Sequence, residues 1–435
     1  MDYYQSCASI NQKLARGIDL HFGEAEASIL PPDPRPLSIP RIGVYAGLGT
    51  SHSWLWFVDL FDRMSFHEIV FINENMVRDG ALECLDIFAM SGGDTIRIAE
   101  ELGRDGALAL ESFIRRGGLY IGSCAGAYLP LKSSKQHLDR FNFVDIKIAN
   151  LSKTRPDAKR MGRKTTTSYG CDFVYHPVRE AVRLRMTGKE PFSGLDSFLA
   201  PLYGGPAMIA PIDSDVLAYY TGFTDKTLFL VDESLAERTL LGKIAAARAK
   251  MGEGHLYLFG PHFEHPLFPV ANHLVAKAIF WDMRKEKKTG SSIEDCSTIV
   301  ATAKEKLVRD IKREISNSRI VAVGLETAPV QWIIGCKIYE PEKIRVFLEA
   351  IWKRIGFLER SGLIRVRCGK SGDIVDLASR VTALLRRIKS MVDDHADTQD
   401  LAGDLFDSLR RLTMIFLQIY FDSFDRNFDP DLKFL

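Results

Sequence analysis

The sequence predicts an α/β fold followed by an all-α region, and three patterns carry this prediction. Between residues 41 and 128, short apolar runs alternate with helix-like stretches. This is the pattern of βαβ units around a parallel sheet. Beyond residue 128, short strand-like runs follow one another without long helices between them, which predicts a β-rich insertion. Beyond residue 290, long amphipathic stretches with short links predict a helical bundle.

Each expected element rests on a local pattern of apolar residues and turn residues. The parallel sheet is expected to contain strands at 41–45, 68–72, 85–90 and 119–121, with a helix at 94–116 that stops at Gly117-Gly118. The insertion is expected to contain strands at 141–149, 171–175, 207–211, 216–221 and 228–231. A hairpin of 243–250 with 255–259 and a helix at 268–285 complete this part. The expected C-terminal helices are 291–316, 341–360, 373–395 and 399–424.

Two linkers divide the chain into three parts. Residues 31–36 hold four prolines, which favour an extended and stiff backbone. Residues 285–290 form a charged and polar stretch, after which the composition changes. We therefore expect an N-terminal segment at 1–39, an α/β domain at 40–288 and a helical bundle at 291–435. Self-association, docking of a partner protein and closure over a pocket are all compatible with the bundle.

The composition describes an ordinary globular protein and excludes several classes. The chain has 435 residues, of which 46% are hydrophobic and 26% charged, and its formal net charge is +1. Such a balance gives no electrostatic reason to expect nucleic acid or an anionic membrane as a partner. No apolar run reaches the length that spans a bilayer, and the N-terminus lacks the features of a signal peptide. The seven cysteines are scattered and lack C-x-x-C spacing, so we expect a reducing, cytoplasmic location without disulfides or a zinc ribbon.

The most informative stretch is a Gly-x-Cys-x-Gly pattern that places Cys124 directly after the apolar run 119–121. A nucleophile elbow has this form, because the sharp turn from strand to helix requires small flanking residues. The turn would present the thiol at the carboxyl edge of the sheet, beside a helix N-terminus that favours the thiolate. The alternative is a buried structural cysteine in a turn of small residues.

Two further stretches favour the catalytic interpretation. Gly92 and Gly93 follow an apolar run, and a Gly-Gly turn exposes N–H groups suited to an oxyanion hole. An ordinary loop, with Asp94 capping the next helix, is the alternative. His262 and Glu264 follow an alternating strand at positions i and i+2, so an extended backbone puts both on one face. Glu264 could then orient His262 as a general base, whereas the histidine spacing fits no common zinc pattern.

These motifs, in this order, resemble the class I glutamine amidotransferase superfamily. They look most like the amidotransferase-like domain at the amino end of biotin-protein ligases and its stand-alone microbial relatives. The resemblance covers roughly residues 40 to 285 and adds the opening strand 41–47 and the Tyr-Gly-Gly-Pro stretch at 203–206. It implies a flavodoxin-like parallel sheet.

The resemblance also implies roles for individual residues. It makes Cys124 the nucleophile, His262 the base and Glu264 its partner, with the N–H groups of Ala125 and of Gly92 or Gly93 as the oxyanion hole. The substrate-binding positions that it suggests are Gly47, Asp94, Tyr128, Tyr203, Gly204 and Gly205. No metal or other cofactor is implied.

Two departures from the family pattern narrow the expected function. Glutamine amidotransferases continue the elbow with His-Gln, whereas this chain has Ala127 and Tyr128, so glutamine is in doubt as the substrate. The chain also lacks a Gly-Arg-Gly-Arg loop, so biotin ligation is not expected. We expect a cysteine-dependent amidohydrolase or amidotransferase that forms a thioester with a small amide or a peptide. A non-catalytic ligand-binding or regulatory module and a cysteine peptidase are the alternatives.

The stretch 51–64 is expected to form a helix rich in aromatic residues, which are Trp54, Trp56, Phe57 and Phe61. Aromatic side chains at helical spacing are more often core residues than ligand platforms. We therefore expect all four to belong to the core.

Overall fold

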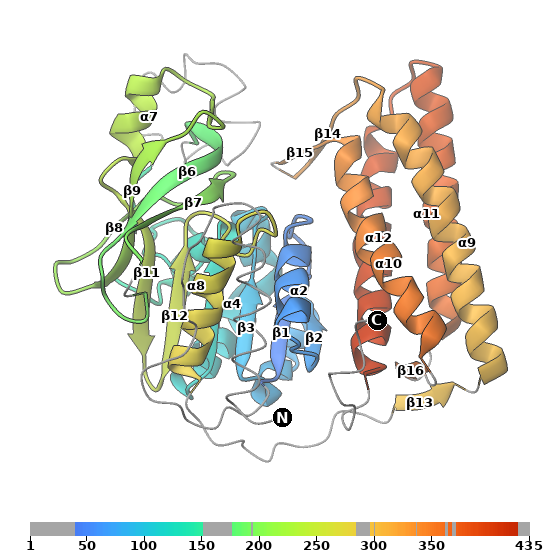
Figure 1. Ribbon diagram of the computed structural model, residues 1–435, viewed down its shortest axis with the longest axis horizontal. Coiled ribbons are helices and arrows are strands. Elements are labelled where there is room, and N and C mark those ends of the chain that lie inside the picture. Colours follow the sequence, from blue (N-terminus) through green and yellow to red (C-terminus); the bar gives the residue numbers. More distant parts are fainter. Residues whose placement is uncertain are drawn as a thin grey trace. The chain divides into compact units, whose positions relative to one another are not determined.

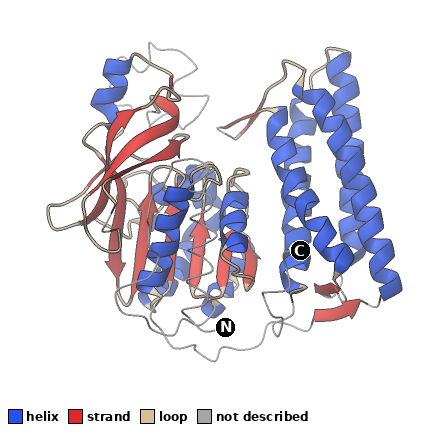
Figure 2. Cartoon of the chain, viewed as in Figure 1, coloured by secondary structure: helices blue, strands red, loops and turns tan. Residues whose placement is uncertain are grey.

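The computed structural model describes residues 40–150, 176–192, 195–283, 296–299, 301–335, 337–361, 364–367 and 371–424. These residues form two compact units, and the main division of the chain falls between residues 290 and 291. The first unit contains a large mixed sheet with helices, and the second consists mostly of long helices (Figures 1 and 2). This architecture confirms the predicted fold class.

The parallel part of the sheet has the order β2-β1-β3-β4-β12. Its strands are β1 (Ile42–Tyr45), β2 (Ile69–Ile72), β3 (Ile87–Met90), β4 (Leu119–Ser123) and β12 (Gly254–Phe259). The pairs β1/β3, β3/β4 and β4/β12 are parallel. Almost every residue in these strands is buried, because helices cover both faces of a parallel sheet. The carboxyl ends of β3 and β4 therefore meet at one edge, where the predicted motifs begin.

Helices cover both faces of this sheet. In Figure 1, α2 (Trp54–Arg63) and α8 (Pro269–Asp282) lie on the side toward the viewer, and α4 (Thr95–Arg115) lies behind the strands. The backbone of α4 leaves helical geometry at Gly103, where φ is 61°. Shorter helices α3 (Glu74–Arg78) and η1 (Ala81–Cys84) connect β2 to β3.

The insertion extends the same sheet rather than forming a separate layer. Strand β11 (Ile244–Met251) pairs antiparallel with β12, β9 (Asp215–Phe223) with β11, and β6 (Val178–Met186) with β9. The remaining elements are η2 (Asp139–Phe141), β5 (Lys147–Ile148), β7 (Ser197–Leu202), β8 (Met208–Ile209), β10 (Leu228–Phe229) and α7 (Glu233–Leu240). The predicted hairpin is confirmed. Of the predicted strand at 141–149, only β5 forms. The elements β6, β7 and α7 were not predicted. The predicted strand at 171–175 lies outside the described residues.

The second unit is a bundle in which each long helix packs against two others. Helices α9 (Ala301–Glu326) and α12 (Gln399–Asp422) both contact α10 (Pro341–Arg360) and α11 (Ser371–Asp393). Two short antiparallel pairs accompany them, β13 (Cys296–Ile299) with β16 (Ile364–Arg367), and β14 (Trp332–Ile334) with β15 (Lys337–Tyr339). No helix in the described ranges is long and apolar enough to cross a membrane.

The bounds of the last three helices agree closely with the prediction, but those of the first do not. Helix α9 begins at Ala301 rather than near residue 291 and continues to Glu326. The cause lies in the preceding residues 296–299, which pair with β16 as a strand and so are not available to the helix. The expected helix start at 291–294 lies outside the described residues.

Candidate active site

Cys124 lies on a strained turn between β4 and the four-residue helix α5 (Ala125–Tyr128). Its backbone has φ 52° and ψ −108°, a region that residues with a side chain rarely adopt. Two sets of hydrogen bonds hold the turn. The Cys124 N–H donates to the Phe259 carbonyl at 3.0 Å, and the Cys124 carbonyl accepts from the N–H groups of Ala127 and Tyr128. Strain that the surroundings enforce in this way is typical of functional residues.

The glycines of the elbow are required by close packing of backbones. A Cβ atom on Gly122 would collide with the carbonyl of Gly126, and one on Gly126 would collide with the carbonyl of Met90. The N–H of Gly126 donates to the Ser91 carbonyl at 3.1 Å, so this approach also ties the elbow to the turn after β3. The Gly-x-Cys-x-Gly pattern therefore reflects the geometry of the turn itself.

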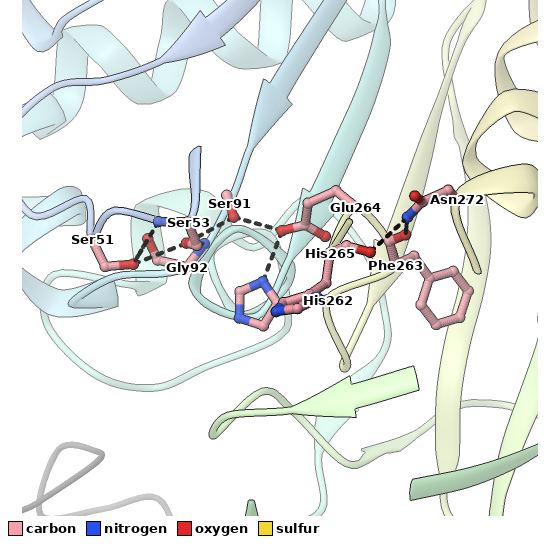
Figure 3. Close-up of polar contacts among 9 residues, drawn as sticks. All are labelled: Ser51, Ser53, Ser91, Gly92, His262, Phe263, Glu264, His265 and Asn272. Atoms are coloured by element: carbon pink, nitrogen blue, oxygen red, sulfur yellow. Dashed lines mark hydrogen bonds and ion pairs between the residues drawn. The ribbon is translucent and has the colours of Figure 1, made fainter. Parts of the chain in front are cut away.

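His262 and Glu264 lie on the loop between β12 and α8 (Figure 3). Nδ1 of His262 is 2.7 Å from Oε1 of Glu264. The edge of the imidazole that carries Nε2 is therefore left free of Glu264, and the His262 side chain is close enough to the Cys124 thiol to lower its pKa. All three side chains are nearly inaccessible to solvent, with exposed fractions of 4% for Cys124, 2% for His262 and 0% for Glu264.

Charge pairing dominates the acid–base properties of this trio. Burial alone would raise the pKa of the Cys124 thiol, but the His262 side chain, together with the Lys337 charge, outweighs burial and lowers it. Burial opposes the charged form of His262, yet the Glu264 and Cys124 charges raise the pKa of His262 to about 10. His262 likewise overcomes the effect of burial on Glu264 and lowers the pKa of that carboxyl. The directions agree on a thiolate and an imidazolium held beside a carboxylate.

The helix after the elbow adds little to this effect. The α5 helix has only four residues, whereas a helix dipole builds up over several aligned peptide units. The expectation that the helix N-terminus activates the thiol is therefore replaced by activation through the imidazolium of His262.

The turn after β3 lies against the His262 ring. A Cβ atom on Gly92 would come within 2.8 Å of Cε1 of His262, so this position has no room for a side chain. The N–H of Gly92 donates to the Ser53 hydroxyl at 3.0 Å. The N–H of Gly93 has no backbone acceptor among the described residues. Of the two glycines, Gly93 is therefore the one with an N–H available to an oxyanion.

A second layer of contacts fixes the base loop. The Asn272 amide donates to the carbonyls of Phe263 at 2.6 Å and His265 at 3.0 Å, which flank Glu264, and its oxygen accepts from Arg63 (Figure 3). The N–H of His262 donates to the Pro201 carbonyl at 2.9 Å on β7. Asn272 is fully buried, so these bonds form away from water.

We expect Asn272→Ala to destabilise the protein and to disturb the base loop. Two buried carbonyls would lose their donor, which costs about 1–3 kcal/mol for each unsatisfied group. Denaturant unfolding would measure the loss. The matched control is Asn142→Ala. The Asn142 side chain likewise makes two hydrogen bonds to the backbone, to the N–H and the carbonyl of Ser133, but it does so in an exposed loop. Equal stability losses in the two variants would contradict the role assigned to Asn272.

Aromatic side chains surround the base. The Trp56 ring lies edge-on to His262 at 5.0 Å and to His265 at 4.3 Å between centroids, and the Tyr203 ring lies 5.8 Å from His262. The Tyr203 hydroxyl donates to Glu180 at 2.9 Å. Trp54, Phe57 and Phe61 are core residues as predicted, but Trp56 is half-buried and belongs to the site, which corrects that part of the prediction.

Among the predicted substrate-binding positions, Gly205 lies close to the nucleophile. A Cβ atom on Gly205 would collide with the carbonyl of Gly260 and come within 3.2 Å of the Cys124 Cα. Gly204 beside it has φ 108°, which suits glycine. Tyr128 on α5 is buried, and its hydroxyl accepts from the Asn150 amide at 3.1 Å.

Two other predicted positions have structural roles near the site. Gly47 packs against Glu74 and Tyr45, not against the triad. Asp94 caps α4 by accepting from the N–H groups of Ile96 and Arg97 at 3.1 Å each. The loop after β1 nevertheless supports the site, because Thr50 and Gly93 form a β-bridge that holds the Gly-Gly turn.

Several residues that contact the triad or its supporting loops could not be given a role in the site from the sequence. They are Ser51, Ser53, Ser91, Trp56 and Asn272. Ser91 directly precedes the predicted Gly-Gly turn, the other four belong to no short motif, and their contacts join segments far apart in the sequence. A helix with tryptophans two positions apart was the one available signal, because such residues cannot share a face.

Several solved structures match part of this chain with a low overall likeness. A putative GMP synthase component from Thermoplasma acidophilum is 14% identical with a TM-score of 0.33, and the match covers 57% of this chain and 98% of that one. A glutamine amidotransferase from Thermotoga maritima is 9% identical with a TM-score of 0.35, covering 56% and 99%.

A β-galactosidase from Bacillus circulans is 13% identical with a TM-score of 0.32, covering 56% of this chain but only 31% of the galactosidase. Among curated protein sequences, none matches this chain significantly.

The family comparison matches residues 41–296, which include the elbow, the Gly-Gly turn and the His-x-Glu loop. The matched range is more than half of the chain and contains every residue of the candidate site described above. The chain therefore belongs to the family described as "Biotin-protein ligase, N terminal".

Proposed function

We propose that this protein is a cysteine-dependent enzyme that cleaves an amide-type carbon–nitrogen bond through a thioester on Cys124. The observation that carries the proposal is the buried chain of contacts from Cys124 to His262 and from His262 to Glu264 at 2.7 Å. A reactive cysteine requires a thiolate, and this arrangement lowers the pKa of the thiol in spite of burial.

In the proposed reaction, the Cys124 thiolate attacks the amide carbon, and the carbonyl electrons move to the oxygen. The N–H groups of Ala125 and Gly93 would stabilise this oxyanion. As the carbon–nitrogen bond breaks, the amine takes a proton from the His262 imidazolium and leaves a thioester. Water then attacks the thioester and gives a proton to His262, which releases the acid and restores the thiolate–imidazolium pair.

Glu264 has an electrostatic and an orienting role in this scheme. It accepts from Nδ1 of His262 and so leaves Nε2 to face the sulfur and the departing amine. Trp56 and Tyr203 pack around the same ring and limit the access of water to it. These contacts therefore shield the charged pair of Cys124 and His262 from water.

The proposal is tested by trapping the acyl-enzyme with a small activated ester, p-nitrophenyl acetate. We expect an acetyl group on the Cys124 peptide, located by mass spectrometry, and its absence in Cys124→Ala. Hydrolysis of a panel of primary amides, glutamine and dipeptides would then define the substrate class, since peptide cleavage without amide hydrolysis indicates a peptidase. Absence of Cys124 acylation together with retained ligand binding in Cys124→Ala would instead indicate a non-catalytic binding module.

A further inference from the structure

Three serine side chains form a continuous line of contacts that ends at Glu264 (Figure 3). The Ser91 hydroxyl is 2.6 Å from Oε1 of Glu264 and 2.9 Å from the hydroxyl of Ser53. The Ser53 hydroxyl lies 2.9 Å from that of Ser51. Ser53 and Ser91 have exposed fractions of 2% and 0%, so water cannot easily replace these contacts.

We propose that Ser53 and Ser91 are positioning residues that join the oxyanion turn to the Cys124–His262–Glu264 triad through one chain of hydrogen bonds. This proposal rests on the proposed function. It adds to that function how the oxyanion turn and the triad are held in a fixed arrangement relative to each other. Ser91 bonds the carboxylate of the triad, and Ser53 bonds the N–H of Gly92 in the oxyanion turn at 3.0 Å.

The Ser91 hydroxyl lies between two acceptors. It is placed to donate either to Oε1 of Glu264 or to the Ser53 hydroxyl, and its single proton can satisfy only one of them. The ionised carboxylate is the stronger acceptor and takes it. The Ser53 oxygen accepts from the N–H of Gly92 and remains 2.9 Å from the Ser91 oxygen, so the carboxylate and the oxyanion turn are linked through these two serines.

The distribution of donors on Glu264 makes Ser91 important. Oε1 receives both side-chain contacts, from His262 and Ser91, whereas Oε2 is buried and has no partner among the described residues. Ser91 is therefore the one side chain besides His262 that stabilises this carboxylate in the described part of the protein. Removing it would weaken the counter-ion of the imidazolium.

Ser53 has a different task, because it bonds the turn itself. Ser51 assists it through one further hydrogen bond, from its N–H to the Gly92 carbonyl at 3.0 Å. With both its N–H and its carbonyl bonded, the Gly92 peptide is fixed. The next N–H, that of Gly93, is thereby held in place for the oxyanion.

The test uses two measurements on the full-length protein. One reports on the triad, where Ser91 contacts Glu264, and the other reports on the oxyanion turn, where Ser53 contacts Gly92. The rate of Cys124 alkylation by iodoacetamide between pH 5 and 10 reports the thiolate. Protection of Cys124 by propionaldehyde reports the oxyanion turn, because the sulfur adds to the aldehyde carbon. The carbonyl electrons move to the oxygen, which then takes the His262 proton, so the addition is reversible and nothing leaves.

We expect Ser91→Ala to lower the alkylation rate at pH 6 about tenfold, which corresponds to about one pKa unit of the thiol. We expect Ser53→Ala to weaken aldehyde protection about fivefold or more and to shift the alkylation profile by less than Ser91→Ala does. In the double variant the effects should be smaller than the product of the single effects, because both serines belong to one chain.

The matched control is Ser318→Ala. Ser318 is also fully buried and its hydroxyl lies 2.9 Å from that of Thr382, but it belongs to α9 in the second unit and to none of the hydrogen bonds described above, so both readouts should stay at the wild-type level. If the wild-type protein shows no preferential alkylation of Cys124, the proposed function itself fails. If wild-type Cys124 is reactive but the serine variants match Ser318→Ala, or their effects simply multiply, the positioning role is overturned.

Discussion

The His262→Ala variant is expected to lose at least about a hundredfold in the rate of Cys124 alkylation at pH 6.5, since each pKa unit changes the thiolate fraction tenfold. The physical reason is the balance at Cys124, where burial raises the pKa of the thiol and the His262 side chain lowers it. Without the imidazolium, burial and the Glu264 charge raise this pKa, and the Lys337 charge opposes them. The alkylation profile should therefore move to higher pH.

A histidine in the same loop provides the control for this prediction. His265 is also largely buried and packs on Trp56 with centroids 4.3 Å apart, but Cys124 owes its lowered pKa to His262. His265→Ala should therefore keep the alkylation profile near that of the wild type. Equal losses in both variants would show that the loop is merely disrupted, and an unchanged rate in His262→Ala would exclude the ion pair.

The Glu264→Gln variant is expected to lower the pKa of His262 from its wild-type value of about 10. Glutamine has nearly the shape of glutamate but no charge, so the imidazolium keeps only Cys124 as a counter-ion while burial continues to disfavour its charge. We expect alkylation of Cys124 at pH 6.5 to fall about tenfold or more, with turnover falling in parallel. The decisive measurement is the His262 pKa by NMR titration in both proteins.

We also expect the difference in stability between the wild type and Glu264→Gln to depend on pH. The Glu264 pKa is depressed in the folded state, so its contribution is present above the ordinary value of 4.5 and is lost as the pH falls. The His262 pKa is raised, so its contribution is complete below pH 6.5 and is lost as the pH rises toward 10. The excess stability of the wild type over Glu264→Gln should be largest between about pH 4.5 and 6.5. A difference that is constant from below pH 4.5 to pH 10 would contradict the charge pairing.

The strands that could be predicted from the sequence are those whose residues are almost all apolar. Strands buried on both faces, such as β3, are continuous apolar runs with turn residues at the end. Strand β6 was not predicted because its alternation of apolar and charged residues begins only at Val182 and is broken before it, where Ala181 and Val182 are both buried. Strand β7 was missed because Pro201 and its neighbours resemble a loop, and proline usually weakens a strand assignment.

The residues of the candidate site likewise divide into those that a local sequence pattern indicates and those that it does not. Cys124, His262 and Glu264 could be predicted because a strained elbow and an i, i+2 pair leave local patterns. Ser91 and Glu264 are 173 residues apart, and a serine after a strand has many possible roles, so no local pattern could indicate their contact.

Trp56 was assigned to the core because it shares a helix with buried aromatic residues. Positions two apart on a helix differ by about 200°, however, so Trp54 can enter the core while Trp56 faces the base.

The measurement that tests the central claim most directly is the pH dependence of iodoacetamide labelling, followed at each of the seven cysteines by mass spectrometry. A thiolate–imidazolium pair predicts that Cys124, although only 4% exposed, reacts faster than the other six between pH 6 and 7. It also predicts an inflection well below the ordinary thiol pKa of 9.0. If Cys124 instead reacts no faster than the others and titrates near or above pH 9, the pair is not formed and the enzymatic interpretation of this site is wrong.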